Sequence, residues 1–373
     1  MQFSDLKAQY AALKDEIDAG IAGVLEHGRY IMGPEVGELE EKLCEFTGSK
    51  HCVTCANGTD ALQLALMALE TRCGDAVFVP SFTFMSTAEA AELVGAEPVF
   101  VDIDPDTFNI DCADLEKKIV TVLAEGRLTP KAVIPVDLFG QCADYDTLLP
   151  IARKYGLYVI EDGAQGFGGS INGKRACTFG DIATTSFFPA KPLGCYGDGG
   201  ALFTDSDELD ALLRSLRIHG KGTQKYDNVR IGLNSRLDTI QAAVLLPKLR
   251  ALGEYELAAR DSLARFYTSQ LSDIAKTPVV KDGYFSAWAQ YTIMLENEET
   301  RDSVQAKLKE CGIPSMVYYP KALHQQKAFS HLAPVSLPVS EAAAKRVLSL
   351  PMHPYMPDED AEKVVSAVRA AVK

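Results

Sequence analysis

The sequence predicts an α/β protein with a large domain built on a seven-stranded, mainly parallel sheet and a smaller C-terminal α/β domain. Over the first two thirds of the chain, short apolar and β-branched runs alternate with helical patterns, as a parallel sheet covered by helices requires. From about Leu246 the pattern changes to long helices rich in Ala, Leu, Glu and Arg, with a lone strand at 290–295. We therefore place the two domains at residues 1–245 and 246–373.

Seven short apolar runs are expected to form the strands of the large sheet. The helical pattern at 60–69, between the first two runs, places Leu62, Leu66 and Leu69 on one face, the spacing of a helix packed on a sheet. The predicted strands are His51 to Cys55, Ala76 to Pro80, Pro98 to Ile103, Ala132 to Val136, Leu157 to Glu161, Ala183 to Phe187 and Ala201 to Thr204.

Composition limits the classes of function. The chain has 373 residues, and its net charge of −14 argues against a broad nucleic-acid surface. No stretch resembles a secretory leader or is long enough to span a bilayer. The nine cysteines have no framework spacing and are expected to be reduced, and Cys52 and Cys55 lack the second Cys or His pair of a zinc site. We expect a cytoplasmic protein without metal that binds neither nucleic acid nor membrane.

The segment Ser186 to Gly194 presents a lysine on a stiff loop. It leaves a predicted strand and cannot become helical, because Pro189 and Pro192 fall close together. Lys191 precedes a proline, which favours extended backbone. A lysine amine forms a Schiff base with an aldehyde when burial or nearby positive charge lowers its pKa. For this segment taken alone, a solvated surface lysine is an equal alternative.

Two further segments are expected at the same edge of the sheet. Asp162 follows the strand Leu157 to Glu161, at the carboxyl end where open α/β sheets bind ligands. A carboxylate there keeps a pyridine nitrogen protonated, which is what pyridoxal phosphate (PLP) chemistry uses. Asn57, Gly58 and Thr59 precede a helix whose first amides form an anion site. Each segment taken alone also suits a helix cap or a turn.

Together these segments resemble the DegT/DnrJ/EryC1 family of sugar aminotransferases, which bind PLP and have the fold type I, aspartate-aminotransferase-like architecture. The resemblance runs from near Asp5 to about Tyr355, with the matching segments in the same order along the chain. They are Tyr30 to Val36, Asn57 to Thr59, Phe82 to Phe84, Glu161 to Gln165, the Lys191 loop and Asn234 to Asp238.

The resemblance implies which residues act on the cofactor. Lys191 would carry PLP as a Schiff base and shuttle protons, and Asp162 would pair with the pyridine nitrogen. These two are the predicted catalytic residues. Gln165 would bond the ring hydroxyl, and Phe84 would stack on the ring.

The resemblance also implies a phosphate site shared between two chains. Gly58, Thr59 and Ser186 would hold the phosphate, joined by Asn234 of a neighbouring subunit, because this family builds its active site across a dimer interface. A homodimer is therefore expected, and a monomer should be inactive.

The substrate pocket is less well defined. Arg236 is the candidate for a substrate carboxylate, because its planar fork suits bidentate pairing, with a structural ion pair to Asp238 as an equal alternative. Tyr319 is assigned to the sugar pocket. Two residues depart from the family pattern: Gly163 stands where alanine is usual, and Tyr318 where histidine is often found.

Within the family, the segments Phe187 to Asp198 and Leu350 to Tyr355 most resemble members that aminate UDP-2-acetamido-2-deoxy-3-oxo-D-glucuronate in bacterial surface-polysaccharide (O-antigen) synthesis. The implied reaction is ping-pong, with L-glutamate as the amino donor. Alternatives are another 3- or 4-keto nucleotide sugar, and a pyridoxamine-dependent sugar dehydratase, whose members have histidine in place of Lys191. A regulatory role has no helix-turn-helix or basic arm to support it.

Two other signals are assigned no catalytic role. Gly168 to Arg175 nearly matches a P-loop, but Arg175 stands where Ser or Thr must bind magnesium. The dipeptide Asn172-Gly173 favours a tight β-hairpin instead. His219 and His353 are left without an assignment.

Overall fold

The computed structural model describes residues 1–224 and 226–372. All seven predicted strands belong to one sheet, in the order β1-β9-β8-β5-β4-β2-β3. Among these strands only β9 (Gly200–Thr204) runs antiparallel to its neighbours, so the predicted mainly parallel α/β sheet is confirmed. The other strands are β1 (His51–Cys55), β2 (Asp75–Pro80), β3 (Glu97–Val101), β4 (Thr129–Val133), β5 (Tyr158–Asp162) and β8 (Ile182–Ser186).

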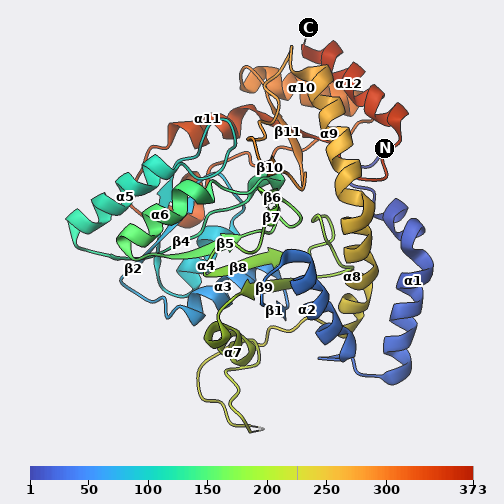
Figure 1. Cartoon of the computed structure of the whole chain (residues 1–373). Helices are drawn as coiled ribbons and strands as arrows, with labels where there is room; N and C mark the ends of the chain where they lie inside the picture. Colours follow the sequence, from blue (N-terminus) through green and yellow to red (C-terminus); the bar gives the residue numbers. More distant parts are fainter. Residues whose placement is uncertain (225, 373) are drawn as a thin grey trace.

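Helices cover both faces of this sheet (Figure 1). One face packs against α3 (Gly58–Ala68), α4 (Ser86–Leu93) and α7 (Asp207–Leu216). The opposite face packs against α2 (Pro34–Thr47), α5 (Cys112–Glu125), α6 (Tyr145–Tyr155) and α8 (Thr239–Ala251). The N-terminal helix α1 (Leu6–His27) lies along α8 on the outside of this layer.

Helix α3 forms where its sequence predicts it. The side chain of Asn57 caps its start, because Asn57 Oδ1 accepts a hydrogen bond of 2.8 Å from Asp60 N. Leu62, Leu66 and Leu69 are all buried against the sheet, and each such leucine stabilises the fold by roughly 1.5–3 kcal/mol. The amides at the start of α3 are therefore held at the edge of the sheet.

The C-terminal part corrects one prediction. The strand expected to be alone, β11 (Tyr291–Met294), pairs antiparallel with β12 (Val347–Leu350), which was missed because so short an apolar run beside a helix has no distinctive period. Around this pair lie α9 (Leu257–Leu271), α10 (Glu298–Glu310), α11 (Pro338–Arg346) and α12 (Asp358–Val372). A π-helical turn (Leu252–Glu256) joins α8 to α9.

The domain boundary stays a prediction. Position 246 lies inside α8, so the change of sequence pattern there falls within a helix and not in a linker. No helix in the described ranges combines the length and the apolar character needed to cross a membrane. All nine cysteines are free thiols.

The predicted β-hairpin is confirmed. Strands β6 (Ser170–Ile171) and β7 (Lys174–Arg175) pair antiparallel, and β10 (Tyr284–Phe285) pairs with β6. Asn172 and Gly173 have φ angles of 50° and 84°, which a type I′ turn requires. Short 3-10 turns complete the chain at Leu138–Gly140, Leu323–Gln325 and Lys327–Phe329.

A buried charge cluster joins α2, β1 and α7. The Glu40 carboxylate accepts hydrogen bonds from Thr54 N (2.9 Å), from Arg214 (2.8 Å) and from Arg217 (2.6 Å). Arg217 is only 3% exposed, so its charge depends on Glu40. These contacts hold the pKa of Glu40 below its usual range although burial opposes this.

Replacing Glu40 by alanine should therefore lower the free energy of unfolding by about 3–5 kcal/mol, because the Arg217 charge would stay buried without a partner. Glu45, on the same helix, is the matched control. Its side chain is 65% exposed in its pair with Lys42, and its loss should cost less than about 1 kcal/mol. Urea unfolding of both variants at one protein concentration measures the difference, and equal costs would contradict this account.

Candidate active site

A cavity of about 430 Å³ opens where β1, β5 and β8 end. Its position agrees with the rule that open α/β sheets bind ligands at the carboxyl ends of their strands. It brings together eight of the ten predicted site residues, which are Gly58, Thr59, Phe84, Asp162, Gln165, Ser186, Lys191 and Tyr319.

Lys191 and Asp162 carry opposite charges in this cavity. Lys191 lies on the loop that follows β8, and this loop is closed by a hydrogen bond of 2.8 Å from Cys195 N to Phe187 O. Burial lowers the pKa of Lys191, and the Asp162 carboxylate opposes that shift. Burial likewise raises the pKa of Asp162, and the Lys191 ammonium opposes it. Each charged form is thus favoured by the other group.

Asp162 is the last residue of β5, and its side chain is held from two sides. Thr87 Oγ1 donates to Asp162 Oδ2 at 3.0 Å, and Ala164 N donates to Oδ1 at 3.2 Å. Both bonds favour the ionised carboxylate. Asp162 is 6% exposed, and the chain supplies it with the donors that a buried charge requires.

Gln165 is also fixed by its neighbours. Its Oε1 accepts a hydrogen bond of 2.8 Å from Phe139 N, and its Nε2 donates to Tyr319 Oη at 3.1 Å. The ring of Tyr319 lies 6.2 Å from the ring of Phe84, between centroids, and Phe84 is 55% exposed. The cavity therefore has one polar wall and one aromatic wall.

The start of α3 forms a close-packed corner with the end of β8. A Cβ atom on Gly58 would lie 2.7 Å from Ser186 Cβ, so only glycine allows this approach. Thr59 Oγ1 lies 2.8 Å from Ser86 Oγ, and Asn57 caps the helix. Free amides of a helix start and three hydroxyl groups thus meet in one corner, an arrangement suited to an anion.

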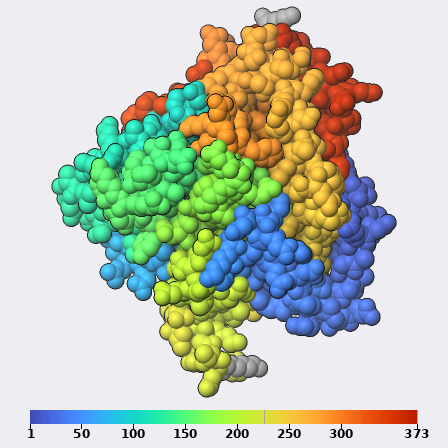
Figure 2. Space-filling view, in the orientation of Figure 1, coloured from blue at the N-terminus to red at the C-terminus, as the bar shows by residue number. Residues whose placement is uncertain are grey.

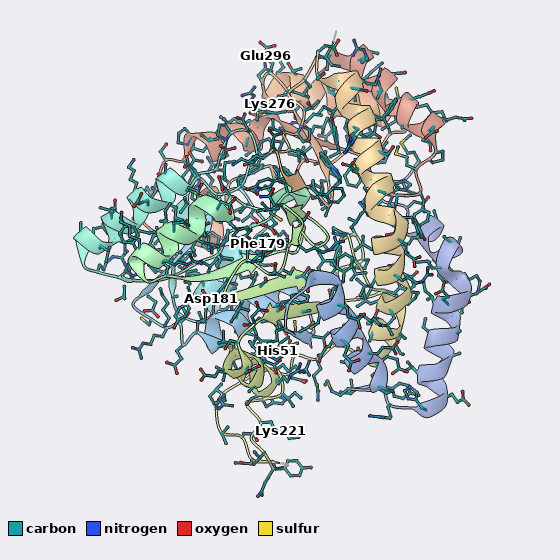
Figure 3. The ribbon with its side chains drawn as sticks, viewed as in Figure 1. His51, Phe179, Asp181, Lys221, Lys276 and Glu296 are labelled. Atoms are coloured by element: carbon teal, nitrogen blue, oxygen red, sulfur yellow. The ribbon has the colours of Figure 1, made fainter. Side chains whose placement is uncertain are left out.

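Asn234 and Arg236 do not reach this cavity within their own chain. Arg236 lines a separate hollow of about 860 Å³ together with residues from the stretches 218–221 and 226–232. Its Nη2 donates to Asn234 Oδ1 at 2.5 Å, and no ion pair within residues 1–224 and 226–372 joins it to Asp238. The segment between α7 and α8, yellow-green in Figure 2, projects from the body of the molecule. Lys221, labelled in Figure 3, lies on this projection.

Neither the contact of Thr87 with Asp162 nor the reason for Gly163 could be predicted from the sequence. Thr87 lies on α4 and reaches Asp162 through a contact 75 positions apart, which no local pattern signals. A Cβ atom on Gly163 would lie 2.7 Å from Cys177 Sγ, so the glycine accommodates a buried thiol. Tyr318, the other departure, lines the cavity beside Tyr319.

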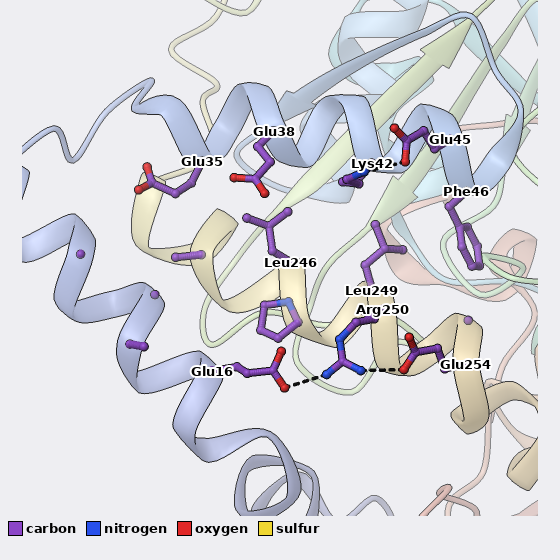
Figure 4. Close-up of a pocket in the computed structure, with 16 residues that line it drawn as sticks. Glu16, Glu35, Glu38, Lys42, Glu45, Phe46, Leu246, Leu249, Arg250 and Glu254 are labelled. Atoms are coloured by element: carbon purple, nitrogen blue, oxygen red, sulfur yellow. Dashed lines mark hydrogen bonds and ion pairs between the residues drawn. The ribbon is translucent and has the colours of Figure 1, made fainter.

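A larger groove of about 800 Å³ lies elsewhere, between α1, α2 and α8 (Figure 4). Arg250 crosses it, with ion pairs of 2.7 Å to Glu16 and 2.6 Å to Glu254. Apolar residues and glycines make up most of its wall, with Glu35 and Glu38 among five glutamates, and none of the predicted site residues lines it. We therefore do not regard it as the active site.

The sequence signature of the DegT/DnrJ/EryC1/StrS aminotransferase family matches residues 11–369. This chain belongs to that family. It is 50% identical, over 98% of its length and 99% of the relative's, to the UDP-2-acetamido-2-deoxy-3-oxo-D-glucuronate aminotransferase of Pseudomonas aeruginosa.

Solved structures agree with this assignment. A family member from Brucella abortus is 54% identical, with a TM-score of 0.97 and 99% of each chain covered. A protein from Bacillus subtilis, solved with bound pyridoxamine phosphate, is 29% identical, with a TM-score of 0.89. The match covers 100% of this chain and 85% of the Bacillus subtilis chain. The fold type I prediction is confirmed, and the chain is a PLP-dependent sugar aminotransferase.

Replacing Thr87 by valine should lower kcat/KM by about 10-fold or more, because a hydrogen bond to a buried charged group contributes about 1.5–3 kcal/mol. The pKa of Asp162 should rise, since one donor to its carboxylate is lost. Thr87→Ser keeps the hydroxyl and should stay within about threefold of the wild type. Equal losses in both variants would show that packing, and not the hydrogen bond, is what matters.

Proposed function

We propose that this aminotransferase moves an amino group from L-glutamate to C3 of UDP-2-acetamido-2-deoxy-3-oxo-D-glucuronate, with Lys191 and Asp162 as its catalytic residues. The single observation that carries the proposal is the shared cavity. A partly buried lysine, a buried carboxylate and an anion corner line one space in a chain that is 50% identical to a relative with this named activity.

The residues present fit PLP. The Gly58 corner suits a phosphate, because a Cβ atom there would fill the space beside Ser186. Asp162 is buried without an ion pair in the described chain, so its charge is available to a protonated ring nitrogen. Phe84 is exposed within the cavity and offers a ring face for stacking. When bound, PLP supplies the electron sink that amino-group transfer requires.

The chain's own residues would then divide the work. Lys191 Nζ would hold the cofactor covalently and, once released, would take and return the proton at the reacting carbon, a task favoured by its lowered pKa. Asp162 would stay ionised, held by Thr87 and Ala164 N. Among the described residues Gln165 Nε2 donates only to Tyr319, so its second N–H could bond the ring hydroxyl.

The binding sites for the sugar carboxylate and for the cofactor phosphate would be completed by a second chain. Arg236 and Asn234 are bonded to each other but lie outside their own chain's cavity, on the flank of a projecting segment with exposed Val229 and Ile231. A homodimer in which each chain inserts this region into its partner's site would bring a guanidinium to the uronate. Tyr319 would line the sugar pocket.

Two other functions are less well supported. A 3- or 4-keto nucleotide sugar without a carboxylate would leave Arg236 without a ligand. A sugar dehydratase is disfavoured by the lysine at 191. We further propose a role in surface-polysaccharide (O-antigen) synthesis and a cytoplasmic location, which the nine free thiols favour.

The absorbance spectrum tests the donor half of the reaction. The wild-type protein with PLP should show the visible band of lysine-bound cofactor, and L-glutamate should replace it with the band of pyridoxamine phosphate. Lys191→Ala should lose both the band and turnover, whereas Lys307→Ala, at an exposed site on α10, should keep both. A Lys191→Ala variant with normal turnover would overturn the proposal.

Replacing Arg236 by alanine tests the acceptor. The rate with the 3-keto uronate should fall by about 10-fold or more, because a charge-assisted pair is lost. The rate with the corresponding 3-keto sugar that has no carboxylate should change little. Equal losses with both sugars would contradict the assignment of Arg236 to the carboxylate.

Mixing subunits shows on which chain Arg236 acts. Lys191→Ala and Arg236→Ala proteins are each expected to be impaired, but a hybrid dimer holds one site with both residues. Equal mixing should restore about a quarter of wild-type activity, since half of the dimers are hybrids with one intact site of two. No recovery after verified subunit exchange would indicate that Arg236 acts within its own chain.

A further inference from the structure

A second acidic residue, Asp137, contacts Asp162 through the backbone. Asp137 follows Val136, whose backbone bridges Asp162, and Asp137 N donates to Asp162 O at 3.0 Å. A Cβ atom on Gly166 would lie 2.6 Å from Asp137 Oδ2, so this carboxyl packs against the turn that begins at Asp162. Asp137 is completely buried, and none of the roles proposed above uses it.

Asp137 and Glu161 form a buried acid pair with no counter-ion. Both side chains are 0% exposed, and no ion pair in residues 1–224 and 226–372 includes either of them. The ionisable groups that interact with Asp137 include Glu161, Tyr145 and the thiols of Cys142 and Cys177, none of them a cation. Two buried anions side by side are strongly disfavoured, so the pair is expected to share one proton.

The hydrogen bonds indicate which carboxyl holds the proton. Both oxygens of Glu161 accept from backbone amides, Oε1 from Cys177 N and Oε2 from Phe179 N at 2.8 Å. Phe179 is labelled in Figure 3. Two amide donors stabilise an ionised carboxylate. Glu161 is therefore the charged member of the pair.

Asp137 also accepts two hydrogen bonds, but both reach the same oxygen. Its Oδ1 accepts from Ala143 N and from Tyr145 Oη, both at 2.9 Å. Its Oδ2 is buried and has no donor within the part of the chain that the structure describes. An oxygen without a donor is satisfied if it is itself the hydroxyl and donates to a nearby acceptor.

We propose that Asp137 is a neutral carboxylic acid whose hydroxyl donates to the Glu161 carboxylate, and that it acts as a positioning residue for Asp162. Burial and the negative charge of Glu161 raise the pKa of Asp137 well above its usual range. The proton removes a negative charge from a residue whose backbone bonds to Asp162, and the ionisation of Asp162 is already opposed by burial. This role toward Asp162 rests on the proposed function, whereas the proton on Asp137 does not.

Infrared spectroscopy of the PLP-loaded protein tests the proton directly. Wild-type protein at neutral pH should show the C=O stretch of a protonated carboxyl, shifted in D₂O, and Asp137→Asn should lack it. Asparagine keeps the shape, keeps the acceptor for Ala143 and Tyr145, and keeps a donor for Glu161. If the wild-type and Asp137→Asn spectra show no such difference, the proposal is wrong, whatever the outcome for Lys191.

Two variants test which carboxyl is neutral. Asp137→Asn should keep kcat/KM within about threefold of wild type, because asparagine mimics the neutral acid. The pH profile of the cofactor band should be the same in both proteins. Glu161→Gln places an amide N–H₂ against a backbone N–H. This variant should lose about 10-fold or more in kcat/KM, or fail to fold. A large loss in Asp137→Asn would overturn the assignment, even if Glu161→Gln cannot be purified.

The stability of the protein against pH gives a readout that is independent of activity. The folded-state pKa of Asp137 is raised above its unfolded value, so its contribution to stability is complete below the ordinary aspartate pKa and decreases as pH rises toward the folded-state pKa. Asp137→Asn removes this decline, and its unfolding midpoint should fall less than that of wild type between acid and neutral pH. Parallel curves for both proteins would contradict the proposal.

Discussion

The opposed charges of Lys191 and Asp162 are the constraint on which the rest of the site depends. Burial disfavours both charges, and each is favoured by the other. The parallel pairing of β5 with β8 places the two segments side by side, and the hydrogen bonds from Thr87 and Ala164 hold the carboxylate. The sheet thus fixes, at one edge, the two groups that we propose to be catalytic.

Much of this arrangement could be predicted from sequence, because it depends on local patterns. Strand and helix periods found the seven strands and α3, and the glycine and prolines near Lys191 marked its loop. The limits of β5 were off by one residue, since a strand end has no side-chain signal of its own. Resemblance to a family, and not periodicity, assigned roles to Gln165, Ser186 and Tyr319.

What the sequence could not reveal are contacts between distant segments. Thr87 on α4 reaches Asp162, and β12 pairs with β11 although two helices separate them in sequence. Asp137, in the segment after β4, interacts with Glu161 on β5. Each depends on which segments become neighbours after folding. The contacts of Asn234 and Arg236 are equally hard to predict from sequence, because their proposed sites belong to another chain.

The contact between Gly163 and Cys177 has an evolutionary consequence. A methyl group at 163 would overlap the thiol sulfur, at 2.7 Å from it, so alanine at 163 and cysteine at 177 exclude each other unless the thiol moves. Both positions lie beside the strand that carries Asp162. A lineage that acquires alanine at 163 must therefore either move the Cys177 thiol or replace it by a smaller side chain, so substitutions at the two positions are coupled.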